Sequence, residues 1–271
     1  METNFFILIV GETLLILLIS IMLFQSLHKI SKLKKNEDEL FELQTLQRDF
    51  IPMLVHELRA PLSVIQGASD LLLKEAGVLS AEQIRDLLGQ VRNSSSNLLK
   101  MVGDILDVSK MDSGKFEINK VYGNINQLLD EECSYFKPLA TIQKKNILPR
   151  LDNSIENISF DPERIKQVMN NLLSNALKFT GSESTITITS QKLDNFIQIG
   201  VSDDGVGVPD EEKVLLFKKF GQAKSANHTE MRGTGLGLYI AKGIVNSHKG
   251  KIWIEDNKPK GVRFMFTLPL V

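Results

Sequence analysis

Residues 5–24 form an almost continuous apolar run, interrupted only by Gly11, Glu12, Thr13 and Ser20. A helical run of about 20 apolar residues matches the hydrocarbon thickness of a bilayer. A basic segment before the run and a small-residue cleavage site after it are both missing, which argues against a cleaved signal peptide. The pattern therefore predicts a transmembrane helix.

Lysines follow this run directly, within a juxtamembrane linker helix that we expect at 25–36. They are Lys29, Lys32, Lys34 and Lys35. Because positively charged segments stay on the cytoplasmic side, we expect a single-pass cell-membrane protein whose domains lie in the cytoplasm. Only a short tail at 1–4 would then be extracytoplasmic, and we expect no extracytoplasmic sensor domain. Glu12 costs roughly 2.5 kcal/mol or more when it faces lipid, so it is either a tolerated residue near one helix end or a contact to a membrane partner.

Two amphipathic helices are predicted within residues 37–113. Apolar residues recur every three or four positions in two stretches that are separated near Gly77. Pro61 interrupts the first stretch without ending it, and Ser80 and Gln83 have the spacing of a capping box at the start of the second. A hairpin with one apolar stripe on each helix cannot bury both stripes well alone, so we expect a homodimer with a four-helix bundle.

Residues 114–271 have a different pattern, in which short β-rich runs alternate with helical segments. The clearest β-rich runs are 185–189, 196–201, 251–255 and 262–268. A helix begins between these segments with Asp161 as its N-cap and Pro162 at its first position. This part of the chain is therefore predicted to be an α/β domain.

Composition and charge argue against nucleic-acid binding and against a structural zinc site. The chain has 32 basic and 33 acidic side chains, which lack the excess of positive charge typical of proteins that bind nucleic acid. The single cysteine, Cys133, forms no internal disulfide, and no Cys/His group has the spacing of a zinc site. We therefore expect no direct nucleic-acid contact and no structural zinc.

The helix that follows Asp161 carries polar residues along one stripe. Asn171, Asn175 and Lys178 are spaced by four and three residues, so they share one face of the helix. Amide oxygens beside an ammonium group suit a magnesium ion and phosphate oxygens. Taken alone, the stripe is equally compatible with an ordinary solvated face.

Two glycine-rich runs, 203–207 and 233–238, follow this helix. Their glycines allow sharp turns or a close approach to a ligand, and the second run opens a helix whose backbone N–H groups favour phosphate. Neither run has Rossmann or P-loop spacing, and the motifs of protein kinases are missing. The whole stretch between the runs, at 208–232, is predicted to be a lid over a nucleotide. It contains Phe217, Lys218, Lys219, Phe220 and a polar run at 224–232.

His56 lies on the polar side of the first amphipathic helix, about 160° away from Leu54 and Leu58. The neighbouring Glu57 is placed to orient and activate an imidazole nucleophile. A surface histidine on a helix is usually silent, so this pair gains weight only together with the other motifs.

Together these segments resemble the motifs of membrane-bound sensor histidine kinases of two-component systems. In chain order they resemble the H box (56–62), N box (171–180), G1 box (203–207), F box (217–220) and G2 box (233–238). The resemblance covers residues 37–271, and five motifs in the family's order make it specific.

The resemblance implies a HisKA-type dimerisation and phosphotransfer hairpin at 37–113, followed at 114–271 by a Bergerat (GHKL) ATP-binding domain with helices on a mixed sheet. The implied activity is ATP-dependent autophosphorylation of His56, followed by phosphoryl transfer to an aspartate of a separate response regulator. The implied cofactors are ATP and Mg²⁺. In phosphoryl transfer the protein mostly positions groups and neutralises charge, which these residue types can do.

Specific roles follow for the residues that match the H and N boxes. Glu57 would help to deprotonate the histidine. Asn175, together with Asn171, would hold magnesium, Lys178 would meet phosphates, and Phe179 would pack near the nucleotide.

Further roles follow for the glycine boxes and the lid. Asp203 would accept a hydrogen bond from the adenine amino group, and Arg232 is a candidate contact to the γ-phosphate. The residues expected to shape the pocket and the hinge of its lid are Gly205, Gly207, Phe220, Gly233, Thr234, Gly235, Leu236, Gly237 and Leu238.

Some features depart from the family pattern. Ala60 stands four residues after His56, where relatives that dephosphorylate their regulator carry Thr or Asn, so we expect weak phosphatase activity. No receiver domain precedes Val271, so we expect a separate regulator.

Three alternatives are a catalytically silent scaffold of kinase shape, another Bergerat ATPase and a membrane anchor for cytoplasmic helices. Intact motifs, the histidine hairpin and the two glycine boxes argue against these alternatives in turn.

Overall fold

The structure is a computed structural model that describes residues 2–75, 77–222 and 234–270, without the side chains of 2–21, 35–47, 49–51 and 53. It divides into two compact units, residues 1–51 and 52–271. The helices are α1 (Glu2–Glu75), α2 (Ala81–Asp112), α3 (Ile125–Ile142), α4 (Pro162–Phe179), α5 (Asp210–Lys213) and α6 (Gly237–Ser247), with a 3₁₀ turn at Leu215–Phe217.

Within the described residues, no helix combines the length and the apolarity needed to cross a membrane. Most side chains of the apolar run at 5–24, including that of Glu12, lie outside the described part of the chain. The transmembrane helix therefore stays a prediction from the sequence.

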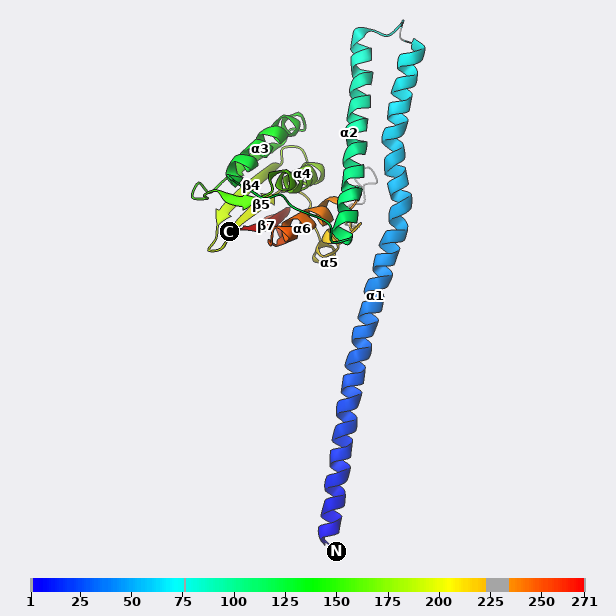
Figure 1. Cartoon of the computed structure of the whole chain (residues 1–271), viewed down its shortest axis with the longest axis vertical. Coiled ribbons are helices and arrows are strands. Elements are labelled where there is room, and N and C mark those ends of the chain that lie inside the picture. The colour runs from blue at the N-terminus through cyan, green and yellow to red at the C-terminus, as the bar shows by residue number, and fades with distance from the viewer. Residues whose placement is uncertain (1, 76, 223–233, 271) are drawn as a thin grey trace. The chain divides into compact units, whose positions relative to one another are not determined.

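From Pro52 on, α1 forms the predicted helical hairpin with α2, and Figure 1 shows these two helices running antiparallel. The capping box is confirmed, because the Gln83 backbone N–H donates to Ser80 Oγ at 3.2 Å and the Ser80 N–H donates to Gln83 Oε1 at 2.8 Å. α1 continues through Pro61, as the resumed apolar spacing predicts. Among the described residues of the hairpin, Ala68 of α1 and Val108 of α2 are buried apolar side chains.

The remainder of the second unit is an α/β domain, as predicted. Its strands are β1 (Val121–Gly123), β2 (Asn146–Arg150), β3 (Ile158–Phe160), β4 (Thr185–Lys192), β5 (Phe196–Ser202), β6 (Ile252–Asp256) and β7 (Val262–Pro269). The main sheet has the order β2-β4-β5-β7-β6, and β1 pairs with β3 separately. The main sheet is mixed, because β2 pairs with β4 in parallel while its other neighbours are antiparallel.

Helices α3, α4 and α6 pack on the main sheet (Figure 1). Alternate residues of β4 point into this core, with Ile186 and Ile188 fully buried and the intervening threonines partly exposed. α4 presents a continuous buried stripe to the sheet and to α6, and Asp161 caps it as predicted by accepting from the Arg164 N–H at 3.1 Å.

A buried histidine joins the end of α6 to the start of α4. His248 is 1% exposed; its Nε2 accepts from the Asp161 N–H at 3.0 Å, and its Nδ1 lies 2.8 Å from the Ile244 carbonyl oxygen. Burial lowers the pKa of His248, so the imidazole stays neutral and holds both contacts. This contact fixes the relative positions of the two helices that frame the site described next.

Candidate functional site

The polar stripe of α4 lies along the wall of a cavity of about 1120 Å³. Asn171 is 6% exposed, and its Nδ2 donates to the carbonyl oxygen of Gly237 at 3.0 Å. Asn175 and Lys178 line the same cavity one and two turns further along. Burial lowers the pKa of the Lys178 ammonium, and the nearby Glu57 carboxylate opposes that shift. The stripe is therefore part of a site rather than a solvated face.

Asp203 is the buried acid of this cavity, with 4% of its surface exposed. Its Oδ1 accepts from the N–H groups of Gly205 at 3.0 Å and Val262 at 3.3 Å. Burial raises the pKa of Asp203, and these two N–H groups oppose the shift. No described residue donates to Oδ2, which leaves that oxygen available for a ligand donor such as an exocyclic amine.

Two glycines make the backbone around Asp203 possible. A Cβ at Gly205 would lie 2.7 Å from the Phe179 carbonyl oxygen. Gly261 has φ +100°, and a Cβ there would lie 2.0 Å from the Asp203 carbonyl oxygen. Gly205 belongs to a predicted motif. Gly261 was missed, because a lone glycine between two strands reads as an ordinary turn residue.

The second glycine run leads into α6, which begins at Gly237 as predicted. Thr234, Gly235, Gly237 and Leu238 line the cavity, while Leu236 is buried beneath it with 1% exposure. The first N–H groups of a helix carry partial positive charge and bind phosphate well. This end of the cavity, beside Asn171, is therefore suited to a polyphosphate.

The hairpin also contributes to the cavity wall. Glu57, Ala60 and Pro61 of α1 line it, together with Asn97 and Lys100 of α2. The exposed His56 next to Glu57 is not among the lining residues.

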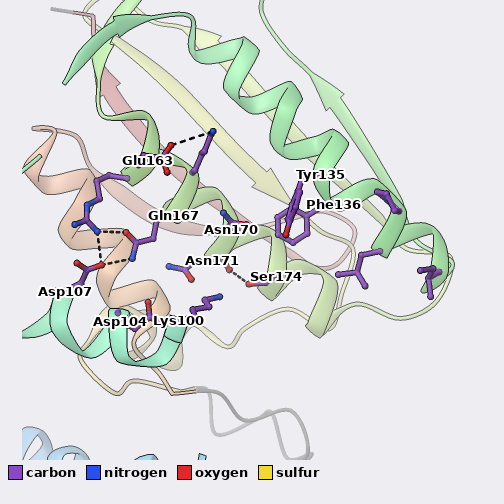
Figure 2. A pocket seen from close by; sticks show the side chains of 16 residues that line it. Lys100, Asp104, Asp107, Tyr135, Phe136, Glu163, Gln167, Asn170, Asn171 and Ser174 are labelled. Carbon is purple, nitrogen blue, oxygen red and sulfur yellow. Dashed lines mark hydrogen bonds and ion pairs between the residues drawn. The ribbon is translucent and has the colours of Figure 1, made fainter. Parts of the chain in front are cut away.

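Side-chain contacts hold α2 against the α/β domain. Asp107 of α2 forms an ion pair with Arg164 of α4 at 2.8 Å, and Gln167 donates to the same carboxylate oxygen at 2.8 Å. Figure 2 shows Gln167 beside Asp107. Asp112 pairs with Lys219 and accepts from the Tyr239 hydroxyl. No pattern in the sequence predicts these contacts, because they join residues more than 50 positions apart.

Comparison with known proteins identifies both parts. Residues 46–114 match the His Kinase A (phospho-acceptor) domain, and residues 160–271 match the histidine kinase-, DNA gyrase B-, and HSP90-like ATPase family. The solved catalytic domain of histidine kinase ThkA is 33% identical, and the match covers 99% of that chain and 56% of this one with a TM-score of 0.51. The chain belongs to the histidine kinase family.

Two further similarities extend over the hairpin of the kinase. The circadian input-output histidine kinase CikA of Synechococcus elongatus is 31% identical over 223 residues, which are 82% of this chain and 30% of that protein. ThkA in complex with response regulator protein TrrA is 28% identical with a TM-score of 0.60, covering 82% of this chain and 61% of that one. The chain thus spans only about a third of the length of its curated relative CikA.

The cavity brings together most of the residues predicted for the kinase. Those that line it are Glu57, Asn171, Asn175, Lys178, Phe179, Asp203, Gly207, Thr234, Gly235, Gly237 and Leu238. Gly205, Phe220 and Leu236 support the surrounding backbone without lining it. Arg232 and Gly233, like the rest of the polar run of the predicted lid, lie outside the described residues.

The sequence missed several lining residues. Val262 and Phe264 of β7 face the cavity although they read as ordinary strand residues, and Lys100 and Asp104 of α2 read as part of a solvated helix face. These positions carry no motif of their own, because their role depends on how distant segments pack.

Proposed function

We propose that this kinase binds ATP in the cavity and transfers its γ-phosphoryl group to His56. The observation that carries the proposal is that Glu57, which directly follows His56, lines the same cavity as Asp203, Asn175 and Lys178. One cavity wall therefore belongs to the helix that carries the acceptor. The family membership and the ATPase match support the same activity.

The transfer step can be written from the residues present. An imidazole nitrogen of His56 attacks the γ-phosphorus while the bond to the β,γ-bridging oxygen breaks and ADP leaves with the bonding electrons. Glu57 accepts the imidazole proton, and Lys178 offsets negative charge on the phosphates. Since His56 does not line the cavity in this structure, the hairpin and the domain must shift relative to one another before transfer.

The amides of α4 fit a magnesium ion that would accompany ATP. The Asn175 carboxamide lines the cavity and forms no hydrogen bond with any described residue, so its oxygen is available as a ligand. Asn171 is tied to Gly237 through its nitrogen, which leaves its oxygen as a second, more restrained candidate. The ion would neutralise phosphate charge and orient the γ-phosphoryl group.

The phosphoryl group would then pass to an aspartate of a separate response regulator. The complex of ThkA with its response regulator supports a partner of this class. Ala60, which lines the cavity, has a methyl group that cannot position a hydrolytic water, so phosphatase activity should be weak. An Ala60→Thr variant that gains no phosphatase activity toward the cognate regulator would count against this account.

A second copy of the kinase would complete the hairpin. Val55 and Leu62 of α1 and Leu88, Leu99 and Leu106 of α2 are exposed apolar residues, each 47% to 74% accessible. Burying such stripes between two hairpins would form the four-helix bundle that we propose for the homodimer. Cross-linking of cysteines introduced at Leu99 should trap a dimer, and a chain that stays monomeric at micromolar concentration would rule this assembly out.

We further propose that residues 5–24 anchor the kinase in the cell membrane, with the domains in the cytoplasm. The apolar run and the lysines that follow it support this placement. Retention of the full chain in membranes after an alkaline carbonate wash would test it, with Leu17→Arg as the variant expected to be released. Complete release of the unaltered chain would contradict the proposal.

The decisive experiment for the activity uses the full chain with γ-labelled ATP and Mg²⁺. We expect label on the unaltered chain that is labile in acid and stable in base, as for a phosphohistidine. His56→Gln should abolish it, while His28→Gln, which removes another exposed histidine of α1, should not.

Two other outcomes would redirect the interpretation. Label that persists in His56→Gln would exclude His56 as the acceptor. ATP binding without any label would favour the catalytically silent scaffold over the kinase.

A further inference from the structure

A second cavity adjoins the proposed nucleotide site. It has a volume of about 990 Å³ and lies between α2, α3 and α4 (Figure 2). Lys100, Asp104, Asn171 and Ser174 line both cavities. Figure 2 shows Lys100 and Asp104 of α2 facing Asn171 and Ser174 of α4. The hairpin therefore reaches the proposed nucleotide site with a cation, Lys100, that no motif predicts.

Lys100 is one of two cations among the described residues that line the nucleotide cavity, and the other is Lys178. Lys178 belongs to the α/β domain, whereas Lys100 belongs to the hairpin. Lys100 forms no ion pair or hydrogen bond with any described residue. Its positive charge lowers the pKa of the neighbouring Asp104 carboxyl, in opposition to burial. Although the Asp104 carboxylate attracts it, an ammonium with no hydrogen bond to a described residue keeps its N–H donors available to an anion.

The position of Lys100 indicates which part of a nucleotide it would meet. With ATP bound as proposed, Asp203 would receive the adenine, while Asn171, which donates to Gly237 at the start of α6, would lie at the phosphate end. Lys100 lies across from Asn171 (Figure 2), and Glu57 of the hairpin lines the same cavity. The phosphate furthest from the adenine would therefore lie nearest to α2.

We propose that Lys100 binds the γ-phosphate of ATP, so that a side chain of the hairpin lets the kinase distinguish ATP from ADP. This inference rests on the proposed function, because it assumes that the cavity binds ATP. ADP lacks the phosphate that Lys100 would reach and would be held by the α/β domain alone. ATP, but not ADP, would then also strengthen the contact between the hairpin and the domain.

Binding of the full chain to MgADP and to MgAMPPNP, a non-hydrolysable ATP analogue, tests the proposal by isothermal titration calorimetry. Lys100→Gln should weaken MgAMPPNP binding about tenfold, as expected for one charged hydrogen bond, and MgADP binding by about twofold or less. Lys100→Arg keeps the cation and should restore most of the affinity. Lys110→Gln, which removes an exposed lysine of α2 that lines neither cavity, should leave both affinities unchanged.

Salt dependence provides a second readout that a merely structural role would not change. Added salt should weaken MgAMPPNP binding more in the unaltered chain than in Lys100→Gln, because the lost contact is between opposite charges. Equal melting temperatures of the two proteins by circular dichroism would exclude a folding defect.

Each other outcome would overturn the inference. If Lys100→Gln binds both nucleotides like the unaltered chain, Lys100 does not contact the nucleotide. If both affinities fall equally, Lys100 does not read the γ-phosphate. An unaltered chain that binds neither nucleotide would refute the proposed function and the inference with it, whereas normal binding with no effect of Lys100 would refute the inference alone.

Discussion

Asp104 of α2 should make the kinase less stable above neutral pH than it would be with an amide at that position. The side chain is 9% exposed, and burial raises the pKa of its carboxyl from 3.8 to about 6. Lys100 opposes this shift, and Asp107 adds to it. Because the folded state holds the proton more tightly than the unfolded chain, stability should rise as pH falls through the folded pKa.

The size of the effect follows from the shift. One pKa unit corresponds to about 1.4 kcal/mol, so a shift of about two units costs about 3 kcal/mol once Asp104 is charged in both states. Near pH 5 about half of this cost remains, and below about pH 4 it disappears. Asp104→Asn removes the charge with little change in shape, so the variant should be more stable by about 1–3 kcal/mol at about pH 8.

Urea unfolding of the full chain, followed by far-UV circular dichroism and by fluorescence of the single tryptophan, Trp253, would measure the difference. The difference between the free energies of unfolding of the two proteins at each pH removes the contribution of the other titrating groups. The advantage of Asp104→Asn should shrink steadily from about pH 8 to about pH 4. A variant that is less stable at about pH 8, or an advantage that does not change with pH, would refute the reasoning.

Two further predictions concern the framework of the site. His248→Leu leaves the Asp161 N–H without its acceptor and should reduce the free energy of unfolding by about 1–3 kcal/mol. Because burial lowers the pKa of His248, the stability that its neutral form contributes should be lost as pH falls below about 6.5, and the variant should lack this loss. An unchanged urea midpoint would contradict this role. Gly261→Ala should abolish MgADP binding measured by calorimetry, because its Cβ would collide with the Asp203 carbonyl. Gly89→Ala, whose Cβ meets nothing within 4 Å, is the matched control, and equal binding by the two variants would exclude the collision.

Local signals in the sequence predicted a large part of the fold. Ser80 and Asp161 cap the helices that were expected there, and the strands at 185–189 and 262–268 agree with β4 and β7 within a few residues. Capping and alternation depend on neighbours in the chain, so they can be recognised without a structure. The parallel pairing of β2 with β4 could not, because it depends on how the chain between them crosses the sheet.

The residues of the candidate site also form two groups, those that the sequence predicts and those that it does not. Asp203 and Asn175 lie in motifs, where residue type and spacing reflect the chemistry directly. Asp104 and Lys100 reach the cavity, and Gly261 reaches the Asp203 backbone, only through tertiary packing, so the sequence around them carries no signal of these contacts. His56 is recognisable from its motif, but the motif does not predict that His56 lies outside the lining of the cavity.

The contacts between α2 and the α/β domain matter for building chimeric sensors. A fusion at Gly114 that joins this catalytic domain to the hairpin of another kinase would leave out Asp107 and Asp112. Arg164 and Lys219 would then lose their partners, and Gly243 would no longer pack against Met111. A functional exchange between relatives should therefore move the last turns of α2 together with the domain that they hold.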